Sequence, residues 1–186
     1  MQDRIPSPYV VYLYGHIFVP ESKFGHKHLV SGKRLNPAEL RKTIKLAMLV
    51  ELYSFGIIDF EIAEVGKLIK RREVFVKMVK NVDDSKAVFF IEKELLSLLK
   101  NFGKVPLRFS INRSTGLEEK FWMDTFAERI NLELAARGYL TKINNQFRPV
   151  EERIMLLREE AERIKQKLEE FRAKNPELAE LVYGAL

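Results

Sequence analysis

Apolar residues recur at spacings of three and four along several parts of the chain, which is the pattern of helices that bury one face. Asn36 and Pro37 form a typical helix start, and Gly56 forms a typical stop. The apolar positions between them cover more than one face, which predicts a deeply buried helix. Further helices are predicted over roughly 85–102 and 116–137, each followed by a glycine.

The clearest periodicity lies near the C-terminus, where six apolar residues follow one another at alternating spacings of three and four. This heptad seam consists of Ile154, Leu157, Ala161, Ile164, Leu168 and Phe171. It predicts a long helix over 150–173, whose seam is covered either by its own domain or by the same helix of a second chain. We expect domain contact near Met155 and partner contact near Leu168 and Phe171, which gives a homodimer.

Short stretches rich in β-branched and aromatic residues predict strands. We expect strands over 9–19, 57–65 and 73–79, joined in a small antiparallel sheet. A hairpin is expected at 139–150, around a turn at Asn144 and Asn145. Residues 20–35 carry many charges and little apolar pattern, which predicts a long, mobile, basic loop.

These elements predict a mainly α fold. We expect a single helical domain over 1–148 with a small antiparallel sheet and hairpins. A C-terminal part over 149–186 holds the heptad helix and a short terminal helix.

Composition limits the chemistry. The chain has 186 residues, 46% of them hydrophobic, and no cysteine. It therefore has no disulfide, no thiolate zinc site and no cysteine nucleophile. No apolar run is long enough to span a bilayer, and the N-terminus lacks the features of a signal peptide. We expect a cytoplasmic protein, with peripheral membrane attachment left open. Its charged residues, 31% of the chain, resemble the composition of heat-adapted proteins.

The net charge of +6 is unevenly distributed. Residues 1–36 carry five cations and two acids, and residues 57–80 carry six cations and four acids. Residues 151–186 have an excess of two acids. The densest basic run, 67–72, holds four cations, which suits either a solvated hairpin loop or contact with an anionic partner.

No motif indicates an enzyme. "GHKHLVSGK" superficially resembles a phosphate-binding loop, but it has the wrong glycine spacing and lacks the hydroxyl that follows the lysine. His16, His26 and His28 have no set of acidic partners nearby, so a metal site is not predicted. No serine has the setting of a hydrolase nucleophile. We therefore expect no catalytic residue, no cofactor and no metal.

The helix over 116–137 and the hairpin after it have the outline of a DNA-binding winged helix. Four acids lie along that helix, and phosphates would repel them. They are Glu118, Asp124, Glu128 and Glu133. Specific DNA binding is therefore not the favoured interpretation.

The succession "AMLVELYSFGIIDFE", "GKLIKRREVFVKMVK" and "FAERINLELAARGYLTKINNQFRPV" resembles the Golgi phosphoprotein 3 family over roughly residues 40–170. This resemblance implies a helical, non-enzymatic scaffold. Eukaryotic members of the family bind phosphatidylinositol 4-phosphate as peripheral membrane adaptors. The family's basic residue before the buried helix core falls on Lys45. Its aromatic membrane residue falls near Asn36, and its arginine pair falls on Asp124 and Ala127.

We therefore expect a non-enzymatic binding or adaptor protein that associates with an anionic membrane surface or lipid headgroup. The cations expected to make this contact are Lys45, Lys67, Lys70, Arg71 and Arg72. Two alternatives stay open. One is a winged-helix-like DNA-binding regulator that dimerises through its C-terminal helix, and the other is a structural protein-interaction module.

Overall fold

The computed structural model describes residues 5–66, 69–80, 89–110 and 122–186, and the chain divides into two compact units. Unit 1 comprises Met1–Ala47 and Glu118–Lys167. Unit 2 comprises Met48–Leu117 and Leu168–Leu186. The boundaries of these units do not coincide with the predicted boundary between residues 148 and 149.

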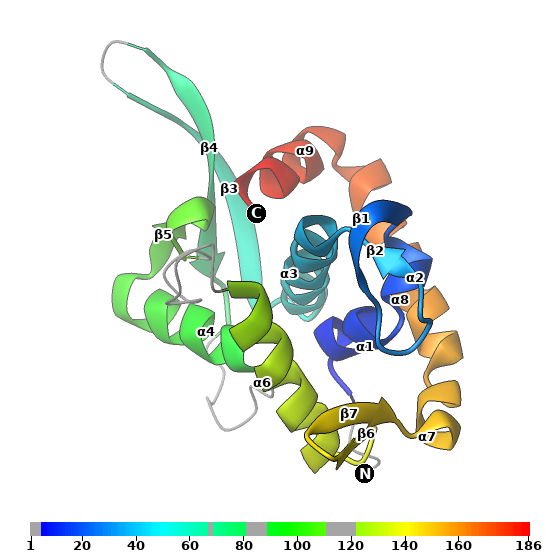
Figure 1. Ribbon diagram of the computed structural model, residues 1–186. Coiled ribbons are helices and arrows are strands. Elements are labelled where there is room, and N and C mark those ends of the chain that lie inside the picture. The colour runs from blue at the N-terminus through cyan, green and yellow to red at the C-terminus, as the bar shows by residue number, and fades with distance from the viewer. Residues whose placement is uncertain (1–4, 67–68, 81–88, 111–121) are drawn as a thin grey trace. The chain divides into compact units, whose positions relative to one another are not determined.

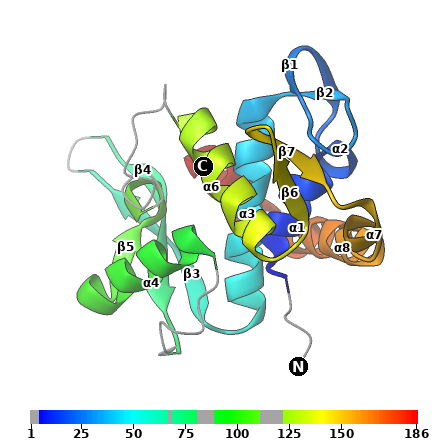
Figure 2. The same ribbon diagram turned by 60° about the horizontal axis from the view of Figure 1, so that its bottom comes forward.

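Unit 1 combines helices with two short hairpins (Figures 1 and 2). Its elements are α1 (Ser7–Leu13), α2 (Gly15–Phe18), β1 (Glu21–Lys27), β2 (Arg34–Leu35), the first part of α3 (Pro37–Ser54), α6 (Trp122–Ala136), β6 (Leu140–Ile143), β7 (Gln146–Pro149), α7 (Glu151–Met155) and most of α8 (Arg158–Lys174).

The strand predicted over 9–19 is wrong, because this segment forms the helices α1 and α2. Pro8 lies in the first turn of α1, where a proline fits a helix. Tyr9, Val10 and Val11 are each 0% exposed, so apolar side chains are buried on every side of α1. A continuous apolar run does not distinguish a buried strand from a buried helix, and burial overrides the strand propensity of valine and tyrosine here.

The mobile loop predicted over 20–35 is also wrong, because β1 and β2 form an antiparallel hairpin there. The pairing contains a bulge, since Leu35 lies opposite both Glu21 and His26. Gly25 allows this geometry. A Cβ atom at Gly25 would lie 2.2 Å from the Leu35 carbonyl oxygen, closer than any side chain permits.

We predict that Gly25→Ala destabilises the protein by about 1–3 kcal/mol, the usual cost of an overpacked contact. The matched control is Gly184→Ala, since no atom lies within 4 Å of a Cβ at that position in α9. It should change the free energy of unfolding by less than about 1 kcal/mol, in the stabilising direction. Urea unfolding measures both, and equal stability of the two variants would contradict the close approach.

The helix predicted from Asn36 is confirmed as α3. The Asn36 Oδ1 atom accepts hydrogen bonds from the backbone N–H groups of Ala38 (3.0 Å) and Glu39 (3.3 Å), as an N-cap does. Side chains on all sides of α3 are buried, including those of Ile44, Ala47, Met48 and Leu49. The prediction of a deeply buried helix is therefore correct.

The helix and hairpin predicted near the end of unit 1 are confirmed as α6 and the β6–β7 pair. Asn144 and Asn145 have positive φ angles of 49° and 62°, which a two-residue hairpin turn requires. The helix start predicted at residues 115–118 lies outside the described residues.

Unit 2 is built on a three-stranded antiparallel sheet in the order β3-β4-β5. Its strands are β3 (Ile58–Val65), β4 (Arg71–Met78) and β5 (Lys104–Pro106), and its helices include α4 (Phe90–Phe102) and α9 (Pro176–Ala185). Helix α4 contacts β4 and β5, and α9 contacts β4. The predicted strands 57–65 and 73–79 are confirmed, but their third strand is β5 and not residues 9–19.

The heptad seam is buried within one chain. All six seam residues are at most 8% exposed, whereas Met155 and Leu156 are 73% and 79% exposed. The expected division, with Met155 on the domain and Leu168 and Phe171 on a partner, is therefore wrong. The predicted long helix is also interrupted at Leu156, between α7 and α8. A homodimer stays a prediction, but it would have to use another surface.

The predicted mainly α fold class is wrong. The structure is 57% helix and 23% strand, with three small antiparallel sheets among the described residues. This is a mixed fold of helices and strands. The main reasons are the β1–β2 hairpin, which replaces the predicted loop, and the sheet of unit 2, which gains β5.

Candidate anionic-surface site

Of the five cations predicted to contact an anionic surface, three lie together at one end of the β3–β4 hairpin. Lys70, Arg71 and Arg72 are exposed there. Lys67 lies outside the described residues. Lys45 does not belong to this surface, because its side chain is only 4% exposed within α3. Residues 43–52 of α3 are all buried, so the helix has no solvent-facing side at Lys45.

The end of the hairpin holds an exposed apolar side chain, Ile69, which is 84% exposed. The backbone closes tightly beside it. Gly66 has a φ of +111°, and a Cβ atom there would lie 2.2 Å from the Ile69 carbonyl oxygen. Only glycine therefore allows the backbone at position 66 to approach the Ile69 carbonyl group this closely. Figure 1 shows that this part of the hairpin extends beyond β5 and α4.

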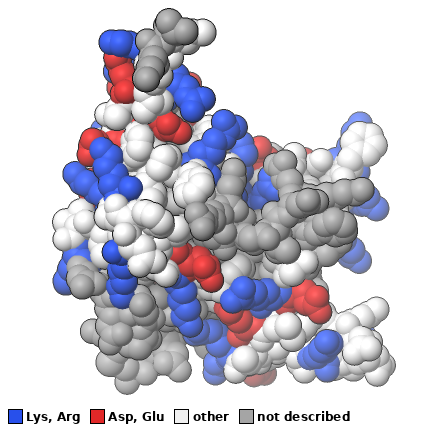
Figure 3. Space-filling model, turned by 90° about the vertical axis from the view of Figure 1, so that its left-hand side faces the viewer, with Lys and Arg blue, Asp and Glu red and all other residues white. Residues whose placement is uncertain are grey.

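Acidic side chains accompany the cations. The Lys70 Nζ atom lies 3.2 Å from a Glu64 carboxylate oxygen, and Arg72 forms an ion pair with Glu177 of α9. All four side chains are more than half exposed. In Figure 3, basic and acidic side chains alternate along the upper part of the hairpin. The cations are therefore partly neutralised by pairs that are weak in water.

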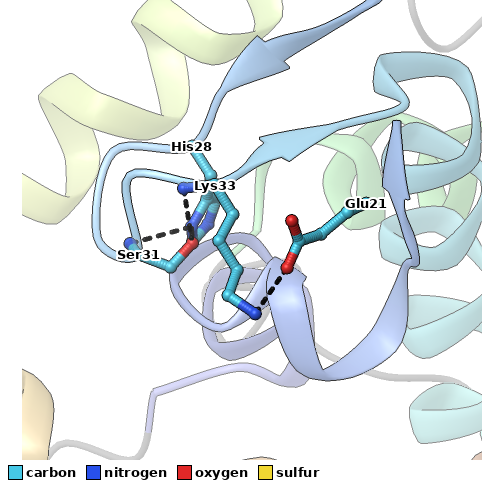
Figure 4. Close-up of polar contacts among 4 residues, drawn as sticks. All are labelled: Glu21, His28, Ser31 and Lys33. Atoms are coloured by element: carbon cyan, nitrogen blue, oxygen red, sulfur yellow. Dashed lines mark hydrogen bonds and ion pairs between the residues drawn. The ribbon is translucent and has the colours of Figure 1, made fainter. Parts of the chain in front are cut away.

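In unit 1, the buried side chain of His28 forms hydrogen bonds within the segment that connects β1 and β2 (Figure 4). The His28 Nε2 atom lies 2.8 Å from the Tyr12 carbonyl oxygen, which can only accept, so Nε2 carries the proton. Nδ1 then accepts from the Ser31 N–H group at 3.2 Å and lies 2.9 Å from Ser31 Oγ. Both ring nitrogens are thus used to hold the hairpin, and this arrangement requires the neutral imidazole.

We predict that the protein loses stability as the pH falls below about 6.5. Burial lowers the pKa of His28. The hydrogen bond to the Tyr12 backbone partly raises this pKa, and the neighbouring His16 lowers it again. Burial and then Lys33 lower the pKa of His16. The unfolded chain therefore binds protons that the folded chain does not. The stability is fully present above pH 6.5 and is lost as the pH falls toward the lowered folded pKa values.

Urea unfolding between pH 7.5 and pH 5 would measure this loss, and the single variants His28→Gln and His16→Gln should each reduce it. A wild-type stability that stays constant or rises as the pH falls through this range would contradict the assignment.

A pocket of about 590 Å³ lies in unit 1, between α2, the β1–β2 connection, α7 and α8. Its volume suits a small molecule. Its charged lining side chains are Arg158, Glu151 and Glu162, which have opposite signs and favour no single class of ligand.

Among the residues that the structure describes, no three His, Asp or Glu side chains are grouped as metal ligands would be. His26 is exposed and His28 is buried, so the two do not present a common face.

None of the helices in the described part of the chain has both the length and the apolar character needed to cross a bilayer.

No protein-family model, no curated protein and no solved structure matches this chain.

Proposed function

We propose that this protein is a non-enzymatic binding protein that associates with anionic membrane surfaces through the distal end of the β3–β4 hairpin. The observation that carries the proposal is the 84% exposure of Ile69 directly beside Lys70 and Arg71. An apolar side chain among cations suits the interface of an acidic bilayer, where the apolar group enters the headgroup layer and the cations meet lipid phosphates.

The ion pairs with Glu64 and Glu177 are compatible with this role. Exposed ion pairs contribute about 0–1 kcal/mol in water. A basic residue close to an acidic membrane contributes about 1 kcal/mol. Lys70 and Arg72 can therefore exchange their carboxylate partners for lipid phosphates at little net cost, while Arg71 has no ion pair among the described residues.

The resemblance to the Golgi phosphoprotein 3 family supports an adaptor role at a membrane, but not its phosphoinositide specificity. The position of the family's aromatic residue falls near Asn36, whose side chain instead caps α3. Its two arginine positions hold Asp124 and Ala127. We therefore propose that the protein is cytoplasmic and attaches peripherally to membranes through their negative surface charge. It would not prefer a single lipid headgroup.

The DNA-binding alternative has weaker support. The exposed part of α6 carries Glu128 together with Arg129, and Arg129 is paired with Glu133 at 3.9 Å. A helix that enters the major groove would place these acids between phosphates, which costs binding energy. We expect any DNA affinity to be weak and independent of sequence.

Vesicle flotation tests the proposal. Wild-type protein should float with phosphatidylcholine vesicles that contain phosphatidylserine, and it should dissociate from them as the salt concentration rises. It should not bind vesicles of pure phosphatidylcholine. A labelled DNA duplex under the same salt series serves as the comparison. Binding to the duplex that exceeds binding to acidic vesicles would favour the DNA-binding alternative. Binding to neither would favour a protein-interaction module.

A further inference from the structure

The β1–β2 hairpin carries the most exposed large apolar side chain in the described part of the chain. Phe24 is 95% exposed, so almost no other atom of the protein covers its ring. A phenylalanine ring that is exposed to water lacks the favourable free energy that burial of its apolar surface would give. The ring is therefore available to a partner.

Cations surround this ring in the sequence of the hairpin. Lys23, Lys27 and Arg34 are exposed, and none of them has an ion pair among the residues that the structure describes. The single acid of the hairpin, Glu21, is paired with Lys33 at 2.6 Å (Figure 4). The hairpin as a whole thus has an excess of three positive charges. At the distal β3–β4 end, by contrast, two of the three described cations are paired with acids.

The hairpin holds Phe24 in place. The bulge at Gly25 brings the backbone against Leu35, whose side chain is buried. At the other end, the His28 ring forms hydrogen bonds with Ser31 and with the Tyr12 carbonyl oxygen. The backbone N–H group of His28 also donates to the Lys33 carbonyl oxygen at 2.7 Å. A restrained backbone loses little conformational freedom when it binds, which favours binding through Phe24.

We propose that the β1–β2 hairpin is a second membrane anchor, in which Phe24 enters the interface of an acidic bilayer and Lys23, Lys27 and Arg34 contact lipid phosphates. This inference rests on the proposed function, but it uses a different hairpin in a different unit. Aromatic rings are favoured at the membrane interface, and basic residues beside them are attracted to acidic lipids.

The geometry favours a membrane over nucleic acid. Sites for single-stranded nucleic acid combine a basic groove with several aromatic rings on which successive bases stack. Phe24 is a single ring, and its 95% exposure places it outside any groove formed by the residues that the structure describes. A bilayer interface needs no groove, because lipids close around an inserted side chain.

The test measures binding to phosphatidylserine-containing vesicles by wild type, Phe24→Ala and Phe24→Trp. Phe102→Ala is the matched control, because Phe102 is also an exposed phenylalanine, at 62%. Phe24→Ala should weaken binding between about tenfold and about a hundredfold. Phe24→Trp should keep the wild-type affinity, since tryptophan also suits the interface. Phe102→Ala should have no effect.

The triple variant Lys23→Gln, Lys27→Gln, Arg34→Gln should weaken binding by roughly a hundredfold at low salt. Thermal unfolding of each variant checks that the substitutions leave the fold intact. We expect little change in stability, because the substituted side chains are exposed.

These measurements distinguish failure of the second anchor from failure of the proposed function. If wild type binds acidic vesicles and Phe24→Ala binds equally well, the second anchor is wrong and the proposed function stands. If wild type does not bind acidic vesicles, both are wrong. If Phe24→Ala keeps vesicle binding but loses binding to a single-stranded oligonucleotide, Phe24 belongs to a nucleic-acid site and the inference is overturned.

Discussion

Replacing Phe171 with alanine is expected to lower the free energy of unfolding by about 3–5 kcal/mol, the range for a buried phenylalanine. Phe171 is 5% exposed, and its ring lies 5.9 Å from the Tyr53 ring and 6.0 Å from the Phe60 ring within unit 2. The variant loses these aromatic contacts and leaves a cavity. Chemical denaturation monitored by circular dichroism measures the loss.

The control for Phe171→Ala is Leu156→Ala, because Leu156 is 79% exposed and should contribute within about 0.5 kcal/mol. Light scattering on both variants separates the two explanations of the heptad seam. If Phe171→Ala keeps its stability but changes the oligomeric state, the seam faces a second chain. A large loss of stability with an unchanged oligomeric state supports burial within one chain.

The triple variant Lys70→Gln, Arg71→Gln, Arg72→Gln is expected to weaken binding to acidic vesicles by about 3 kcal/mol, or roughly 150-fold, at low salt. Each substitution removes one positive charge next to Ile69 and keeps a polar side chain of similar length. The measured loss should shrink as salt screens the interaction. Co-sedimentation at several salt concentrations gives this comparison.

A matched variant removes the same charge elsewhere. Lys165→Gln, Lys167→Gln, Lys174→Gln takes three charges from α8 and leaves the hairpin untouched. If binding depends on the hairpin, the α8 variant should lose much less affinity. Equal losses would show that only the net charge matters and that the hairpin is not the site.

Elements with strong local signals were predictable from the sequence. Asn36 and Pro37 mark the start of α3, because capping needs only the residues beside the cap. Asn144 and Asn145 mark the β6–β7 turn, because few residues accept positive φ angles. The pairing of β3 with β4 follows from two stretches rich in β-branched residues that lie close together in the sequence.

Elements set by tertiary contacts were not predictable. The residues of α1 favour strands locally, and only burial on all sides makes a helix the better solution. The β1–β2 hairpin has few apolar residues, and its pairing depends on the close approach of Gly25 to Leu35. The interruption at Leu156 follows no proline or glycine, so the sequence gives no sign of it.

The candidate site was predictable only in part. The basic run at 67–72 indicated the end of the β3–β4 hairpin, but not that Glu64 and Glu177 would lie beside its cations. Lys45 was included through the family resemblance, which gives no sign that its side chain is only 4% exposed within α3. Phe24 was missed, although a lone aromatic residue within a polar, basic stretch was a signal that could have been used.

The most direct test uses the absence of cysteine from the chain, because one introduced cysteine gives a single labelling site. An environment-sensitive fluorophore on Ile69→Cys should shift to the blue when phosphatidylserine-containing vesicles are added, and the shift should disappear at high salt. The same label on Leu156→Cys, a comparably exposed position, should report no change. Membrane-bound protein whose label at position 69 stays in water, or shifts no more than the label at position 156, would contradict membrane attachment through the β3–β4 hairpin.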